Sequence, residues 1–168
     1  MNMKEKLEKY LNNYLDEPKK TFTGLFKMAR SSFFEESLGE ACYDYSEINN
    51  FIDKNKDENT FQTKLFKYID DKNLKDSDVY NKARIDRRLF SKIRSDINYH
   101  PSKETVILLA LALELSEYEV EDLLESASYS LPKNTTYDLI IRFCFKECIY
   151  DINQINEFLY DHDCKILN

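Results

Sequence analysis

A run of basic and small polar residues at helical spacing is the segment of this sequence best suited to chemistry. Its polar side consists of Arg87, Arg88, Ser91 and Lys92, directly after Asp86. Leu89, Phe90 and Ile93 occupy the opposite side of the same helix. Arginine binds the edge of guanine in the DNA major groove through two hydrogen bonds, and serine and lysine reach bases or phosphates. The same pattern is also typical of a solvent-exposed helix with surplus arginine, so both interpretations stay open here.

The charge distribution points to the same segment. Residues 60–103 carry 11 Lys and Arg against six Asp, a net charge of +5, whereas the remaining chain carries −12. Residues 104–127 contain seven acidic residues and no basic one. The first segment could therefore face an anion, which the rest of the chain would repel. The acidic stretch is either a surface for a basic partner or a means of solubility.

A second group of residues has ligand chemistry. Cys144 and Cys148 stand four residues apart, so a helix would place both on one face, and His162 and Cys164 follow near the end. Such a set could bind zinc. The surrounding residues are apolar, however, and buried cysteine in such surroundings acts as a small hydrophobic side chain. We therefore expect no metal, no disulfide and no cofactor.

Glycine and histidine are too scarce for most kinds of active site. Two Gly and two His in 168 residues leave no glycine-rich phosphate loop and no nucleophile with its base. The sequence thus favours a binding protein over an enzyme. Two Gly and three Pro also cannot supply the turns of a sheet-rich fold, so we predict an all-α protein.

Capping residues and apolar spacing divide the chain into helices. The predicted helices cover 4–16, 22–33, 45–54, 60–72, 77–83, 87–95, 103–115 and 117–127, followed by an apolar helix capped by Asn134 and a last helix opened by Asp151 and Gln154. The predicted caps of the middle helices are Asp44, Asp76, Asp86, Ser102 and Ser116. We expect three regions: a helical N-terminal extension (1–59) that packs on the rest, a helix-turn-helix core (60–130) and a C-terminal helical pair packed on the core (131–168).

The longest apolar run, Val106–Leu113, is less than half a membrane span. The N-terminal residues are charged throughout and lack the apolar centre of a signal peptide. We expect a cytoplasmic protein without a membrane partner.

The segment 65–124 resembles the lambda-repressor/Cro-like helix-turn-helix family over all five of its helices. The motif helices correspond to LKDSDVYNKARID (74–86) and DRRLFSKIRSD (86–96), and the fourth and fifth to PSKETVILLALALEL (101–115) and SEYEVEDLL (116–124). More narrowly, residues 60–168 resemble a bacterial module often found as the C-terminal tail of larger proteins. The resemblance implies a five-helix lambda-repressor-like core with helical extensions at both ends.

Two functions follow from the residues and the resemblance together. In the first, the protein is a DNA-binding regulator, normally a homodimer, in which Arg87, Arg88, Ser91 and Lys92 read the groove. The residues expected to hold phosphates are then Lys75, Lys82, Tyr99 and Lys103. In the second, it is a protein-interaction or adaptor module that keeps the fold without binding DNA. Asp76 and Asp78 favour the second, because carboxylates there repel the DNA backbone.

Overall fold

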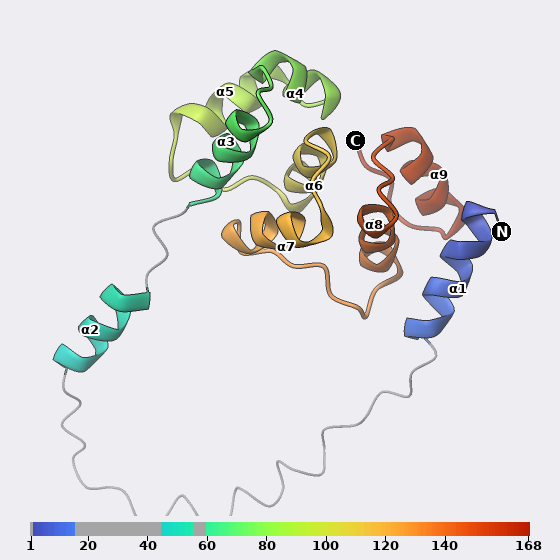
Figure 1. Ribbon diagram of the computed structural model, residues 1–168, viewed down its shortest axis with the longest axis horizontal. Coiled ribbons are helices and arrows are strands. Elements are labelled where there is room, and N and C mark those ends of the chain that lie inside the picture. The colour runs from blue at the N-terminus through green and yellow to red at the C-terminus, as the bar shows by residue number, and fades with distance from the viewer. Residues whose placement is uncertain (1, 16–44, 56–59) are drawn as a thin grey trace, which may run out of the picture. The chain divides into compact units, whose positions relative to one another are not determined.

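The computed structural model describes residues 2–15, 45–55 and 60–168 of the chain. These ranges form nine α-helices and no strand, which confirms the predicted all-α class (Figure 1). The helices are α1 (Met3–Leu15), α2 (Tyr45–Asn55), α3 (Phe61–Asp71), α4 (Asp76–Lys82), α5 (Arg87–Ser95), α6 (Lys103–Ala112), α7 (Glu117–Ser126), α8 (Thr136–Lys146) and α9 (Ile152–Asp161). The predicted helix over 22–33 and the predicted cap Asp44 lie outside the described residues.

The chain divides into two units. One consists of Met1–Asp16 together with Asn59–Asn168, and the other is Glu17–Glu58. The two predicted N-terminal helices that the structure describes therefore fall in different units, α1 in the first and α2 in the second. Among the described residues, no helix combines the length and the apolar character that crossing a membrane requires.

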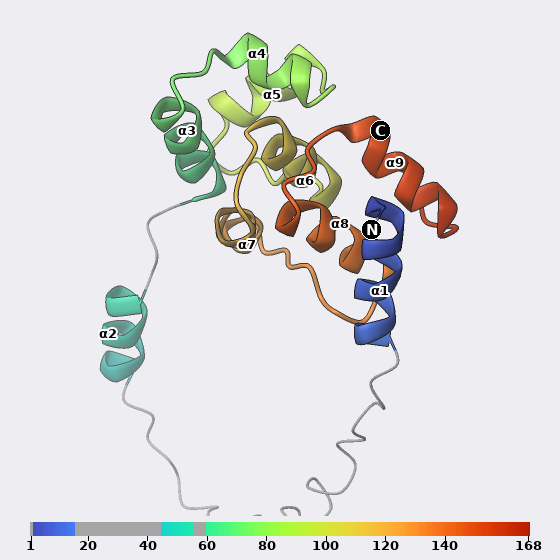
Figure 2. The same ribbon diagram turned by 45° about the vertical axis from the view of Figure 1, so that its right-hand side comes forward.

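Helix α6 is the centre of the larger unit. Its sequence is apolar on every side, and all residues from Val106 to Leu113 are buried. A helix that is apolar all round must be enclosed by other elements. Helices α4 and α7 pack on it, and both views place it between the α3–α5 group and α8 (Figures 1 and 2). The core thus provides the support on which the short helices α4 and α5 rest.

Helix α1 packs on α8 and reaches α9. Leu7 and Leu11 are buried, and the ring of Tyr10 lies 5.4 Å from that of Phe143 in α8. Two ion pairs flank this apolar contact, with Lys4 Nζ 2.6 Å from Asp161 Oδ2 and Lys6 Nζ 2.9 Å from Glu147 Oε2. Burial of the two leucines accounts for about 1.5–3 kcal/mol each, more than half-exposed ion pairs supply.

Four of the predicted N-terminal caps are confirmed. Asp86 accepts from the Arg88 N–H at 2.6 Å, and Ser102 caps α6. Ser116 and Glu119 form the full capping box of α7, and Asp151 caps α9. Capping side chains satisfy N–H groups that a helix leaves without partners, so the local sequence is enough to predict them.

Two predicted caps are wrong by one residue. Asp76 is the first residue inside α4, and Lys75 takes the cap position without a side-chain hydrogen bond. Asn134 is also replaced, because Thr135 caps α8 by accepting from the Asp138 N–H at 3.1 Å. The Asp76 carboxylate instead binds Arg94, and the carboxylate of Asp138, in the first turn of α8, binds Lys103.

Six helices end in the same type of turn, and none of them uses glycine. The residues in the left-handed region are Asn73 (φ 52°), Arg84 (56°), Glu114 (49°), Ser128 (59°), Cys148 (55°) and Asp163 (54°). Each is followed by a residue whose N–H bonds the carbonyl five positions back, as Ile85 does to Tyr80 at 3.0 Å. This is the Schellman geometry. It also explains why the predicted helix over 103–115 ends at Ala112, two residues before Glu114.

Candidate nucleic-acid interface

Helix α5 is held firmly on its inner side. Phe90 and Ile93 are buried, and the Phe90 ring lies edge-on to that of Phe66 in α3 with 5.9 Å between centroids. Gln62 of α3 donates to the carbonyl of Ile93 at 2.9 Å and also to that of Arg94. With its inner face and its C-terminal end tied to α3, α5 presents a fixed outer face.

The outer face of α5 brings together the four residues predicted to read DNA. Arg87, Arg88, Ser91 and Lys92 are all exposed. In the described part of the chain, the side chains of Arg87, Arg88 and Ser91 form no hydrogen bond or ion pair. Lys92 Nζ lies 4.5 Å from the ring centroid of Tyr99, a cation–π contact. The result is a compact cationic face with donors available to an external anion.

The residues predicted to hold phosphates are in less uniform surroundings. Lys75 is exposed at the start of α4, and Tyr99 lies beneath Lys92. Lys82 is bound to Glu114, however, and Lys103 Nζ lies 2.5 Å from Asp138 Oδ1. Two of the four therefore have a carboxylate partner within the chain, and only a competing phosphate could engage them.

These ion pairs belong to a larger match between the basic and acidic segments. Helix α3 packs on α7, where Lys64 Nζ lies 2.6 Å from Asp122 Oδ1. Tyr68 donates to the same carboxylate at 3.1 Å, and burial together with this negative charge raises the pKa of Tyr68 to about 12. Much of the acidity of residues 104–127 is thus neutralised inside the fold, which favours a structural role over a basic external partner.

Three further acidic side chains of this stretch have partners from the C-terminal part of the chain. Arg142 of α8 binds Glu117 at 2.9 Å and Glu121 at 2.5 Å. Lys165 Nζ lies 2.8 Å from Glu104 Oε2, and the N–H of Asn168 donates to the other oxygen of the same carboxylate. Few acidic side chains of residues 104–127 are left without a partner, whereas Arg87 and Arg88 on α5 have no carboxylate partner in the described residues.

Arg94 has a role that the sequence does not reveal. Its Nη2 lies 2.5 Å from Asp76 Oδ1 of α4, and its guanidinium stacks 4.0 Å from the ring centroid of Phe66. The carboxylate that sequence analysis expects to repel DNA is therefore neutralised in place. Because Asp76 and Arg94 are 18 residues apart, no local pattern could have signalled the contact.

The cysteines do not assemble into a metal centre in the described residues. Cys144 is buried in α8, and burial raises the pKa of its thiol to about 12. Cys148 follows the end of α8 in a left-handed turn and is exposed, so the two do not share a helical face as expected. No group of three or more potential ligands (His, Cys, Asp or Glu) comes together among the residues that the structure describes.

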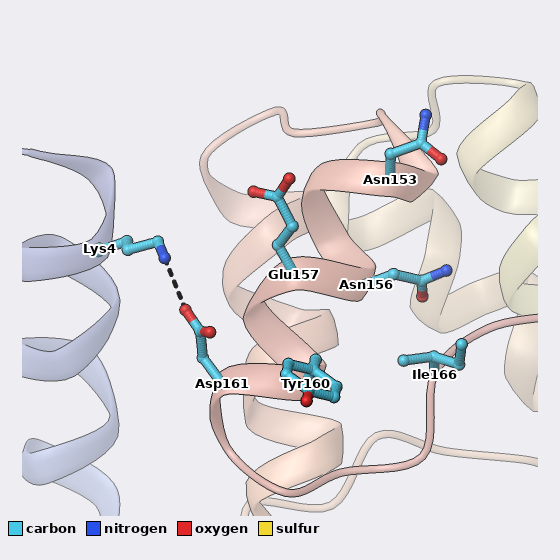
Figure 3. A pocket seen from close by; sticks show the side chains of 7 residues that line it. All are labelled: Lys4, Asn153, Asn156, Glu157, Tyr160, Asp161 and Ile166. Atoms are coloured by element: carbon cyan, nitrogen blue, oxygen red, sulfur yellow. Dashed lines mark hydrogen bonds and ion pairs between the residues drawn. The ribbon is translucent and has the colours of Figure 1, made fainter.

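A second surface lies beside α9. A shallow pocket there is lined by Lys4, Asn153, Asn156, Glu157, Tyr160, Asp161 and Ile166 (Figure 3). Tyr160 is 77% exposed and Ile166 is 38% exposed. Asn156 is not available to a ligand, because its amide exchanges two hydrogen bonds with the backbone of Leu167, at 3.0 and 2.8 Å. The pocket offers an aromatic ring, an amine and acidic side chains.

Comparisons with known proteins identify no relative from which a function could be inferred. No family model, no curated protein and no solved structure matches the chain. The resemblance to the lambda-repressor/Cro-like family therefore stays a prediction from the sequence.

Proposed function

We propose that this chain is a non-catalytic DNA-binding protein that places α5 in the major groove. In this proposal α3 to α7 form the five-helix core of a lambda-repressor-like fold, with α4 and α5 as the helix-turn-helix. The connection between α4 and α5 is short, and it turns at Arg84, whose guanidinium binds Asn153 of α9 at 2.9 Å. A rigid turn of this kind supports a fixed angle between the two helices.

One observation carries the proposal. Three basic residues around α5, Lys82, Arg94 and Lys103, are engaged by carboxylates of the same chain, whereas Arg87 and Arg88 are exposed and have no such partner in the described residues. Both lie in the first turn of α5, which is the part of a recognition helix that approaches base edges. Exposed arginines without partners can form the bidentate contact to guanine that gives the strongest sequence discrimination.

The test is selection of duplexes from a random library at near-physiological salt, where a merely cationic surface binds weakly. We expect one sequence to be enriched, arranged as two half-sites if the protein binds as a homodimer. Arg87→Ala and Arg88→Ala should each cost about 1–3 kcal/mol on that sequence and relax the choice of base at one position.

The matched control is Lys9→Ala, which removes one exposed positive charge from α1. It should leave both affinity and sequence choice unchanged within about twofold. If no sequence is enriched, or if Lys9→Ala and Arg87→Ala lose equal affinity for the enriched sequence, the proposal of sequence-specific DNA binding is overturned.

The alternative is a protein-interaction module. It is favoured by the exposed Tyr160 and Ile166 beside α9, since aromatic side chains are enriched at protein interfaces. It is also favoured by Lys82 and Lys103, whose charges are already neutralised within the chain. The two functions separate experimentally, because Tyr160→Ala should weaken binding of a protein partner and leave DNA selection unchanged.

A further inference from the structure

A pocket opens between α4 and α5 on the proposed DNA-binding face. Its lining residues are Asp76, Ser77, Tyr80, Arg87, Phe90, Ser91 and Arg94. We propose that the Asp76 carboxylate competes with phosphate for Arg94. It binds the Arg94 guanidinium until a backbone phosphate of DNA enters this pocket and displaces the carboxylate. This inference rests on the proposed function and adds how the site is regulated.

The lining has the chemistry of a phosphate site apart from one group. Two guanidinium groups, of Arg87 and Arg94, and the hydroxyls of Ser77 and Ser91 border the same pocket. Arginine and hydroxyl donors are the usual ligands of phosphate oxygens in proteins. Asp76 is the exception, because a carboxylate in the wall of such a pocket repels an entering anion.

The position of Arg94 suits an exchange of one anion for another. The guanidinium also lies over the Phe66 ring, with Cζ 4.0 Å from its centroid, a contact that does not involve Asp76. Nη2 bonds Asp76 Oδ1 at 2.5 Å, and a guanidinium has further N–H donors in the same plane. Arg94 can therefore release the carboxylate and bind a phosphate without leaving its aromatic support.

The ion pair is also weak enough to be displaced. The side chain of Arg94 is 50% exposed and that of Asp76 is 38% exposed. Water screens a pair of this exposure, so it competes with an arriving phosphate by a factor of only about two to five. A competitor of this strength lowers binding to every DNA sequence equally, because a phosphate contact carries no sequence information.

The experiment compares Asp76→Asn with Asp78→Asn. The two variants change net charge equally, and both residues lie in the first turn of α4. Asp78 is the matched control, because it is an exposed carboxylate that is not among the pocket's lining residues and does not bind Arg94. Each variant of the full chain is titrated with an unselected duplex, by fluorescence anisotropy, and separately with pyrophosphate, by NMR. Melting temperatures establish that both variants are folded.

We expect Asp76→Asn to bind both probes about two- to fivefold more tightly than the unchanged protein. Asp78→Asn should change either affinity less than Asp76→Asn does, because the Asp78 carboxylate does not bind Arg94. Adding Arg94→Gln to Asp76→Asn should remove the gain.

Equal effects of the two Asn variants, or a gain that persists without Arg94, would overturn the competitor role of Asp76. A gain with pyrophosphate alone, while no variant binds duplex, would overturn the proposed DNA-binding function and leave the phosphate pocket standing.

Discussion

Asp138 is the one buried charged residue in the described part of the chain, and its surroundings show how this fold treats charge. Its side chain is about 5% exposed and accepts from Lys103 Nζ at 2.5 Å and from the Thr135 hydroxyl at 2.7 Å. The contact joins the start of α6 to the start of α8. A buried carboxylate is tolerated only while such partners replace the water it has lost.

We therefore predict that Lys103→Met lowers the free energy of unfolding by about 2–3 kcal/mol, because it leaves Asp138 buried without its counter-charge. The measurement is urea denaturation, with Lys9→Met as the control for an exposed lysine. The double variant Lys103→Met, Asp138→Asn should be more stable than Lys103→Met alone, since the orphaned charge is then absent. Equal stabilities of Lys103→Met and the control would contradict the structural role of this pair.

The partners of the basic residues could be predicted from the sequence less well than their exposure. Arg87 and Arg88 are predictable, because the alternation of apolar and basic residues within one helix determines which side is exposed. Lys82 and Lys103 are predicted to hold phosphates on equal grounds, but their partners Glu114 and Asp138 lie 32 and 35 residues away. Which carboxylate meets which lysine depends on helix packing, which no local pattern records.

At the scale of elements, the ends of the helices are the distinctive feature. The two glycines of the sequence, Gly24 and Gly39, lie outside the described residues, so six left-handed turns are made by residues with a Cβ atom. Such a conformation costs a non-glycine residue about 1 kcal/mol relative to glycine. The fold accepts this strain because the residue after each turn bonds back to its helix.

Ser128 offers the cleanest test of this strain, since it is exposed and has a φ of 59°. We predict that Ser128→Gly raises the free energy of unfolding by about 1 kcal/mol, as glycine adopts this conformation without steric conflict. The matched control is Glu125→Gly, three residues earlier within α7, which should lower stability by about 1 kcal/mol. Thermal melting of both variants provides the measurement, and a loss of stability in both would contradict the strain argument.

Helix positions are largely predictable for the same local reasons. Of the helices predicted within the described residues, each is present, and the side chains of Asp86, Ser102 and Ser116 cap as expected. Boundaries differ at both kinds of helix end, since α4 already includes Asp76 and α6 ends at Ala112, before the turn at Glu114. Local sequence thus predicts that a helix exists better than it predicts its first residue.

At the scale of the larger unit, the uneven charge of the sequence contributes to helix packing through ion pairs. The basic segment 60–103 lies against the acidic segment 104–127 through α3 with α7 and α4 with α6. Ion pairs of Lys64 with Asp122 and of Lys82 with Glu114 bridge these contacts. Some of the opposite charge of the two segments therefore meets within the fold, whereas Arg87, Arg88 and Lys92 on α5 have no carboxylate partner in the described residues.

This arrangement predicts that the protein loses stability in acid. The hydrogen bond and the charge of Lys82 hold the pKa of Glu114 below its ordinary value of 4.5. For Glu119, burial raises the pKa, but the hydrogen bonds from the backbone and hydroxyl of Ser116 outweigh it and the pKa is lowered. Such groups bind fewer protons when folded than when unfolded. Their stabilisation is therefore present above pH 4.5 and is lost as the pH falls through their lowered pKa values.

The measurement is the melting temperature between pH 7 and pH 3, in the unchanged protein and in Glu114→Gln. We expect the unchanged protein to keep its melting temperature until the pH approaches 4.5 and then to lose it progressively. Glu114→Gln should start lower at pH 7, because Lys82 has lost its charged partner, and should decline less below pH 4.5. Glu125→Gln, which neutralises an exposed carboxylate on α7, should follow the unchanged protein throughout. If the profile of Glu114→Gln instead runs parallel to that of the unchanged protein, the contact between the basic and acidic segments does not depend on this ion pair, and apolar packing of α4 on α6 alone holds them together.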